Sequence, residues 1–164
     1  MRNVKDAKRI VIKVGTSTLT HRNGRLNLKL MDRLAMVLSD IKNSGREVIL
    51  VTSGAVTAGM NKMGLKERPK EIKEKQAAAS VGQCELMFIY DKLFSQYGHV
   101  VSQLLLTKDV TENEVLCNNV VNTFETLLSY HVLPIINEND SVAIDELVYG
   151  DNDMMSAVTA KILN

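Results

Sequence analysis

The sequence has no tryptophan, only two cysteines and few aromatic residues, and each shortage excludes a class of protein. Aromatic side chains make up 4% of the 164 residues, too few for the stacking platforms that bind single-stranded nucleic acid. Cys84 and Cys117 lie far apart and have no CxxC neighbour, so neither a disulfide framework nor a zinc site is expected. We expect two reduced, mostly buried thiols.

An excess of charge of one sign and a long apolar run are also missing. The 20 Lys and Arg residues balance 19 Asp and Glu residues, and the net charge of +1 gives no broad field to attract nucleic acid or an anionic membrane. No apolar run approaches the roughly 20 residues that span a bilayer, and no N-terminal stretch resembles a signal peptide. We therefore expect a cytoplasmic protein that binds a small polar ligand.

The apolar residues that are present predict alternating strands and helices in one domain. The expected strands cover 9–14, 47–52, 99–106 and 132–136. The expected helices cover 27–44, 71–97, 118–130 and 153–163, with a possible interruption at Gly82 and a possible hairpin arm at 143–148. This succession predicts an α/β fold, in which helices sandwich an open, mostly parallel sheet in three α/β/α layers.

The first predicted strand ends in residues that suit a phosphate group. In open α/β sheets, ligands bind beyond the carboxyl ends of the strands. Lys13 interrupts an apolar strand, and a buried ammonium is costly unless it meets an anion or water. The next residues, Gly15, Thr16 and Ser17, would let backbone amides approach an anion closely. The structural alternatives are a lysine that reaches solvent from the strand end and a simple turn.

The second predicted strand ends in a similar way, at Ser53, Gly54 and Ala55. Gly54 suits a sharp turn, and the Ser53 hydroxyl can donate to a carboxylate. The structural alternative is an N-cap for a helix over 56–63. The sequence contains neither GxxxxGK[ST] nor a GxGxxG after the first strand, which excludes the P-loop and the dinucleotide fingerprint.

Two clusters of amides and carboxylates follow, Asn137-Glu138-Asn139-Asp140 after a strand and Gly150-Asp151-Asn152-Asp153 before the last helix. Carboxylates near Lys13 would suit phosphoryl transfer, in which lysines and Mg²⁺ neutralise charge. Hard oxygen ligands favour Mg²⁺ over zinc, although no metal ligand is assigned. Helix capping by Asp151 or Asn152, or a site that binds only a metal, would also fit the pattern.

These strings resemble the glutamate 5-kinase family of amino acid kinases. The resemblance runs from about Lys8 to the last residue and rests on four strings in matching order and spacing, over 12–17, 51–56, 136–142 and 150–153. It implies ATP-dependent phosphorylation of the γ-carboxylate of L-glutamate to γ-glutamyl phosphate, the first step of proline biosynthesis. It also implies use of Mg²⁺, proline as a feedback inhibitor and a homo-oligomer.

The resemblance implies roles for individual residues. Lys13 matches the lysine that contacts the ATP phosphates, with Gly15, Thr16 and Ser17 beside it. Asp153 matches the aspartate that orients the catalytic lysines. The residues expected to bind glutamate are Ser53, Gly54, Ala55, Asn137, Asp140 and Asn152.

The family's kinase domain continues into a second part that supplies the adenine pocket and another catalytic lysine. Residues 1–164 are therefore expected to be the N-terminal, glutamate-binding part of such a domain, without the ATP-binding C-terminal part and with little activity alone. Two other functions stay open at this point. One is a non-catalytic amino-acid-binding module, and the other is a kinase for another carboxylate or a carbamate.

Overall fold

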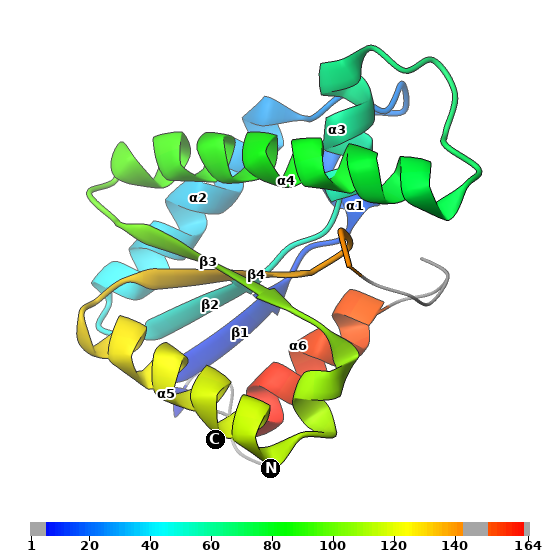
Figure 1. Cartoon of the computed structure of the whole chain (residues 1–164). Helices are drawn as coiled ribbons and strands as arrows, with labels where there is room; N and C mark the ends of the chain where they lie inside the picture. Colours follow the sequence, from blue (N-terminus) through cyan, green and yellow to red (C-terminus); the bar gives the residue numbers. More distant parts are fainter. Residues whose placement is uncertain (1–5, 143–150, 163–164) are drawn as a thin grey trace.

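A four-stranded parallel sheet forms the centre of the protein in a computed structural model, which describes residues 6–142 and 151–162 (Figure 1). The strands are β1 (Arg9–Lys13), β2 (Glu47–Val51), β3 (Val101–Leu106) and β4 (Leu133–Glu138). Their order across the sheet is β1-β2-β4-β3, and every neighbouring pair is parallel. The four predicted strands are thus confirmed, with ends within two residues of those expected.

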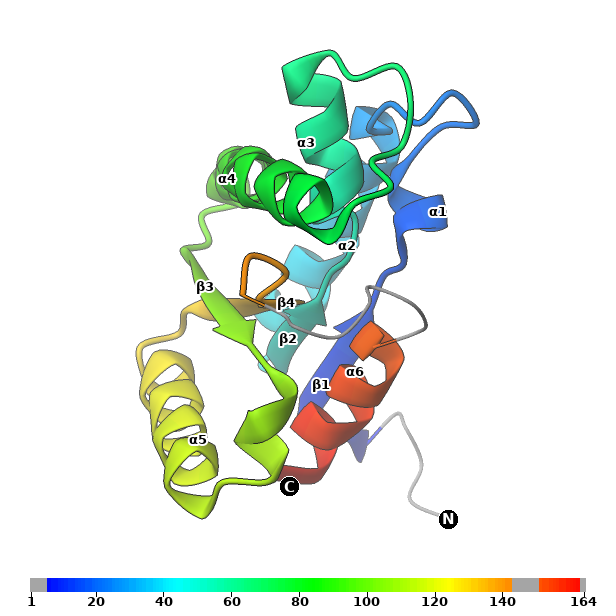
Figure 2. The same ribbon diagram turned by 45° about the vertical axis from the view of Figure 1, so that its right-hand side comes forward.

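Helices cover both faces of the sheet, which confirms the predicted three layers (Figures 1 and 2). One face carries α2 (Leu28–Asn43), α3 (Ala55–Met63) and α4 (Ile72–Ser95), and the other carries α5 (Glu114–Ser129) and α6 (Asp151–Ile162). Two short segments, α1 (Thr16–Leu19) and the 3₁₀ turn η2 (Lys108–Thr111), follow β1 and β3.

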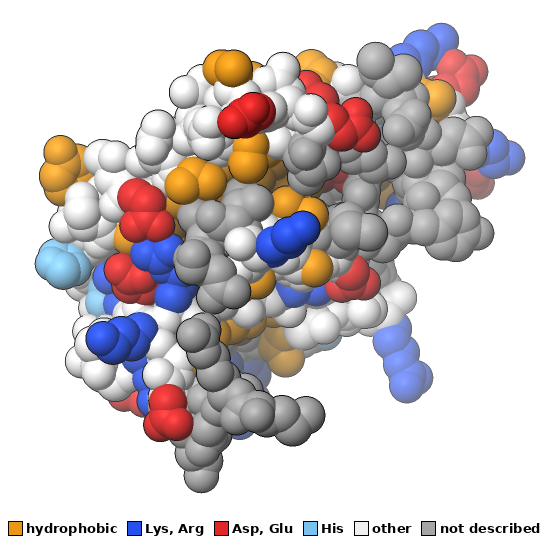
Figure 3. Space-filling view, turned by 90° about the horizontal axis from the view of Figure 1, so that it is seen from below, with side chains coloured by type: hydrophobic (Ala, Val, Ile, Leu, Met, Phe, Trp, Pro, Cys, Tyr) orange, Lys and Arg blue, Asp and Glu red, His pale blue; other side chains and the backbone are white. Residues whose placement is uncertain are grey.

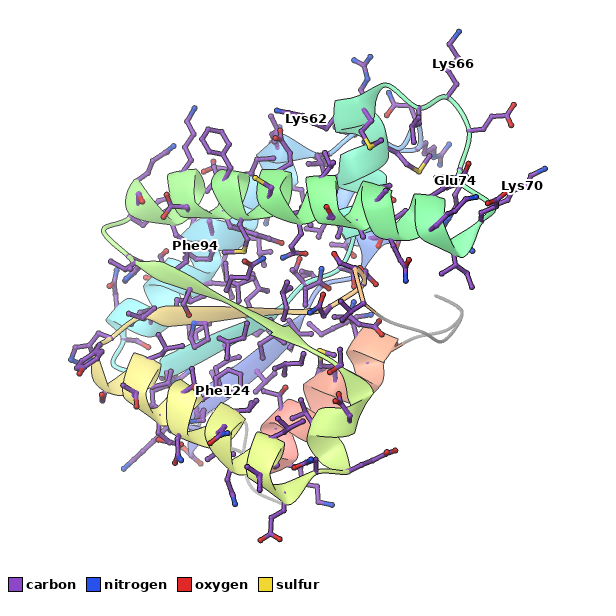
Figure 4. The ribbon with its side chains drawn as sticks, viewed as in Figure 1. Lys62, Lys66, Lys70, Glu74, Phe94 and Phe124 are labelled. Atoms are coloured by element: carbon purple, nitrogen blue, oxygen red, sulfur yellow. The ribbon has the colours of Figure 1, made fainter. Side chains whose placement is uncertain are left out.

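The alternation of side chains along β2 divides the apolar core into two parts. Leu50 faces the α2, α3 and α4 layer and belongs to the same cluster as Phe94, whereas Val51 faces the opposite layer and joins Phe124. Figure 4 shows these two aromatic rings reaching toward the sheet from α4 and from α5. Both rings are fully buried, so each face of the sheet packs against an apolar layer.

The α4 helix runs without a break, so the possible interruption at Gly82 is wrong. Gly82 instead lies where α4 crosses α3. A Cβ atom there would stand 2.7 Å from the Ala55 carbonyl carbon and closer still to the Ala55 oxygen and the Gly59 nitrogen. Gly59 meets the backbone of Ala78 in the same way. The two glycines therefore let the helix backbones touch.

The α5 helix begins at Glu114, four residues before the predicted start. The Asn113 side chain accepts hydrogen bonds from the backbone N–H groups of Val115 at 3.0 Å and Leu116 at 3.1 Å, so it satisfies two amides of the first turn. The hairpin arm expected at 143–148 lies outside the described residues.

The surface mixes charges of both signs, and in Figure 3 the Lys, Arg, Asp and Glu side chains are intermingled among uncharged groups. Cys84 is exposed and Cys117 is half-buried, so the expectation of mostly buried thiols is wrong, although both are free. Within the described ranges, no helix combines the length and the apolar character that a bilayer crossing requires.

Candidate functional site

The parallel sheet brings the carboxyl ends of all four strands to one edge, where several predicted site residues meet. Backbone hydrogen bonds continue just past β1 and β2, since Val14 N–H donates to Val51 O at 2.9 Å and Thr52 N–H donates to Ile136 O at 2.8 Å. Beyond these hydrogen bonds, the segments that follow β1 and β2 leave the sheet. We call the side chains gathered at this edge, Lys13, Ser53, Asn137, Asn152 and Asp153, the strand-end site.

Lys13 lies at the end of β1 and forms an ion pair with Asp153 of α6, with 2.7 Å between Nζ and Oδ1. The Lys13 side chain is 29% exposed and that of Asp153 is 70% exposed. An ion pair so open to solvent adds little to stability. The pair places the ammonium group at the strand ends, in a position partly open to solvent.

Three polar side chains from different elements form a chain of hydrogen bonds. Asn152 Nδ2, on α6, donates to Ser53 Oγ at 2.8 Å and lies 3.4 Å from Asn137 Oδ1. Asn137, on β4, is 1% exposed and in turn donates through Nδ2 to Gln83 Oε1 at 2.7 Å. The Asn152 Oδ1 atom is buried and has no hydrogen-bond partner in the described part of the chain. An unpaired acceptor of this kind is suited to a donor group of a ligand.

The loops after β1 and β2 lie against each other. A Cβ atom on Gly54 would stand 3.7 Å from Thr16 Oγ1, and one on Gly15 would stand 3.5 Å from Lys13 Nζ. Gly15 thus leaves the space beside the ammonium group open. Gly54 adopts a φ of 98°, a left-handed conformation that other residues rarely take, so it permits the sharp turn into α3.

The structure decides two of the capping alternatives. Gly54, and not Ser53, is the N-cap of α3, and it makes no side-chain capping hydrogen bond. Asn152 lies inside the first turn of α6, which begins at Asp151, and its side chain is directed to Ser53 and Asn137. The interpretation of Ser53 or Asn152 as a simple N-cap is therefore wrong, whereas the Asp151 side chain lies outside the described part of the structure.

The remaining predicted site residues lie nearby along the chain. Ala55 is the first residue of α3 and is buried. Thr16 and Ser17 open α1, where Ser17 is exposed. Asp140 lies in the turn that follows β4 and is half-buried.

Sequence reasoning missed the contribution of α4 to the site. Besides Gln83, this helix supplies Tyr90, whose hydroxyl shares a 2.8 Å hydrogen bond with Thr52 Oγ1 immediately before Ser53. Burial raises the pKa of Tyr90 to about 12, a rise that the hydrogen bond to Thr52 partly offsets. Nothing in the sequence around a glutamine or a tyrosine within a helical pattern indicates that its side chain contacts a functional site. Both contacts depend on how α4 packs on the sheet.

Comparison with known proteins extends these observations. The sequence model described as the amino acid kinase family matches residues 8–164. Relatives named glutamate 5-kinase from Clostridium perfringens and Listeria innocua are each 55% identical over 165 residues, and one from Enterococcus faecalis is 54% identical over 168. These alignments cover 98%, 98% and 99% of this chain but only 61%, 60% and 62% of the relatives. The chain therefore spans about 60% of the length of the curated relatives it matches.

The fold is also found in a solved structure. The structure of a Giardia carbamate kinase superposes with a TM-score of 0.63, covering 96% of this chain and 71% of that chain. The two sequences are 15% identical, so this likeness concerns the fold alone.

Proposed function

The chain belongs to the amino acid kinase family, and from that premise we propose that it forms the glutamate-binding part of a kinase for the γ-carboxylate of L-glutamate. The observation that carries the proposal is the placement of the Ser53, Asn152 and Asn137 hydrogen-bond chain at the same sheet edge as the Lys13–Asp153 ion pair. One set provides neutral donors and acceptors for an amino acid. The other provides a cation for a phosphate.

In the proposed reaction, a γ-carboxylate oxygen of glutamate attacks the γ-phosphorus of ATP. The bond from that phosphorus to the bridging oxygen breaks, and ADP leaves with the electron pair. Lys13 would neutralise negative charge on the transferring group, and Asp153 would keep the ammonium in place. ATP with Mg²⁺ would supply the phosphoryl group and further charge neutralisation.

The residues around Lys13 suit a phosphate in shape as well as charge. Gly15 carries no side chain to fill the space beside Lys13 Nζ. The N-terminus of α3 presents amides without a capping side chain, next to Gly54 and Ala55. Helix N-termini attract anions, so this end of α3 would approach the reacting carboxylate. Ser53, Asn137, Asp140 and Asn152 would bind the rest of the glutamate molecule.

The proposal also covers the setting of the reaction. The product, an acyl phosphate of glutamate, would enter proline biosynthesis, with proline as a feedback inhibitor. The enzyme would work in the cytoplasm as a homo-oligomer. Because the relatives are longer than this chain, the adenine pocket would come from a part of the kinase domain that these 164 residues do not include.

The direct test is ADP release with L-glutamate, ATP and Mg²⁺. It should be run on this chain and, where the reading frame continues beyond Asn164, on the longer product. Lys13→Ala is expected to lower kcat by about 10²–10³-fold, the usual loss when one charge-stabilising group is removed. Lys62→Ala is the matched control. It also removes a lysine that pairs with an acidic side chain, Glu85 at 2.8 Å, but Lys62 lies on α3 outside the strand-end site.

Three outcomes would contradict the proposal in different ways. Equal activity of the Lys13→Ala and Lys62→Ala variants would remove the role of Lys13. Preference for another carboxylate or a carbamate in a substrate panel would change the substrate. Calorimetric binding of glutamate with no ADP release from any form would favour a non-catalytic amino-acid-binding module.

A further inference from the structure

Gln83 is a polar residue of α4 that is 8% exposed, yet the apolar pattern gives no reason for an amide at that place. Its Oε1 atom accepts a hydrogen bond from Asn137 Nδ2 at 2.7 Å, from a residue 54 positions away in sequence. Its Nε2 atom is buried without a partner among residues 6–142 and 151–162. A buried N–H group left unpaired costs stability, so Gln83 is a poor choice for a core residue. Its bond to Asn137 is the contribution that sets it apart from an apolar side chain.

The packing of α4 holds Gln83 firmly in this position. The adjacent Gly82 lies against the backbone of α3, where the two helices touch. Tyr90 lies two turns later on the same face of α4 and is tied by its hydroxyl to Thr52. Hydrogen bonds from one helix therefore reach the ends of both β2 and β4, and Figure 1 shows α4 lying across the sheet above them.

The bond from Asn137 to Gln83 also couples the orientation of the Asn137 amide to that of the amides on either side of it. With Nδ2 of Asn137 turned to Gln83, its Oδ1 faces Asn152 Nδ2 at 3.4 Å. Asn152 Nδ2 also donates to Ser53, which leaves Asn152 Oδ1 as a buried acceptor. If one amide alone were turned over, two donors or two acceptors would face each other. The three amides therefore keep a common direction.

We infer that Gln83 is a positioning residue of the amino-acid pocket, because it orients the Asn137 amide and, through Asn137, the amide of Asn152. Held in this direction, Asn152 presents a carbonyl oxygen, the group that accepts from the ammonium of an amino acid. Gln83 itself does not touch the substrate. The inference rests on the proposed function, since it assigns Gln83 to the binding of the same glutamate molecule.

The test is the dissociation constant of L-glutamate, measured by calorimetry on this chain. Gln83→Met keeps the length of the side chain but removes the acceptor, and it should weaken binding about 10-fold, the loss expected for one buried hydrogen bond and the alignment it imposes. Gln96→Met is the matched control, because Gln96 is exposed at the C-terminus of the same helix. It should leave binding unchanged.

Two further variants separate positioning from a general loss of structure. Gln83→Glu retains an oxygen acceptor for Asn137, so it should bind glutamate more tightly than Gln83→Met, and it serves if the Met variant fails to fold. In an Asn137→Ala background, Gln83→Met should raise the dissociation constant of glutamate by less than about a further twofold, because the effects of residues that act through one another are not additive. A full additional 10-fold loss in that background would overturn the inference.

The outcomes separate the inference from the function it rests on. Glutamate binding by the parent chain, with unchanged binding by a folded Gln83→Met variant, overturns the role of Gln83 and leaves the proposed function intact. A parent chain that binds no glutamate overturns the proposed function, and the inference with it.

Discussion

Replacement of Gly82 by alanine should destabilise the protein, although alanine is the better helix former. In a helix open to solvent, Gly→Ala contributes about 1 kcal/mol of stability. At Gly82 the added methyl group would stand 2.7 Å from the Ala55 carbonyl carbon and closer to two other backbone atoms of α3. Backbone atoms cannot rotate away as side chains do. Either α3 or α4 must therefore shift, and overpacking of this kind costs about 3 kcal/mol or more.

The difference between the two effects predicts a net loss of about 2 kcal/mol or more in the free energy of unfolding for Gly82→Ala. For a protein of this length, that loss corresponds to a fall of roughly 4–8 °C in Tm. Urea unfolding followed by circular dichroism would measure the free energy, and a thermal scan would measure Tm.

Ala77→Gly is the control, because Ala77 is exposed on the same helix and should lose only about 1 kcal/mol, the helix propensity difference. A Gly82→Ala variant as stable as the parent, or more stable, would refute the account of the α3–α4 contact. It would mean that helix propensity outweighs the overlap of the two backbones.

Two further predictions concern a buried tyrosine and a helix cap. Because the pKa of Tyr90 is raised to about 12 in the folded protein, the unfolded chain loses this proton first, near pH 10. The free energy of unfolding should therefore fall by about 2 kcal/mol between pH 10 and pH 12. Urea unfolding at these pH values should show that this decrease in the free energy of unfolding disappears in Tyr90→Phe. Tyr130→Phe is the control, because that side chain is 73% exposed, and it should show the same decrease as the parent. Asn113→Ala should lower the free energy of unfolding by about 1 kcal/mol, because it removes the cap of α5. Asn119, which is exposed within α5, provides the control. An equal decrease for Asn119→Ala would contradict the capping explanation.

The elements with continuous apolar runs were the most predictable from the sequence. The β1 and β2 strands each begin and end within one residue of the expected positions, because a nearly continuous apolar run marks their extent. The α2 helix matches equally well, because its apolar residues keep one helical stripe from end to end. The start of α5 was missed by four residues. Val115 and Leu116 are exposed in that first turn, so they fall outside the apolar stripe, and the useful signal was the Asn113 cap.

The strand-end site was predictable only in part. Lys13, Ser53 and Asn137 stood out because polar residues at strand ends contrast with the apolar strands before them. The Asn152 contacts to Ser53 and Asn137 join segments 99 and 15 residues apart, and the pattern before α6 fitted a helix cap equally well. Gln83 could not be found from sequence, because its contact with Asn137 depends on the packing of α4 over β4.

The strand order β1-β2-β4-β3 also affects how the protein folds. The β4 strand enters the sheet between β2 and β3, which precede it in the chain. Among the described strands, β3 therefore has no neighbour until residues 133–138 have emerged, and the backbone N–H and C=O groups on the edge of β2 that later pairs with β4 stay unpaired for as long. Parallel pairings between distant segments form slowly and leave such edges exposed to aggregation. Insertion of β4 is thus the step that joins β3 to the other described strands, and the same step places Asn137 beside Gln83.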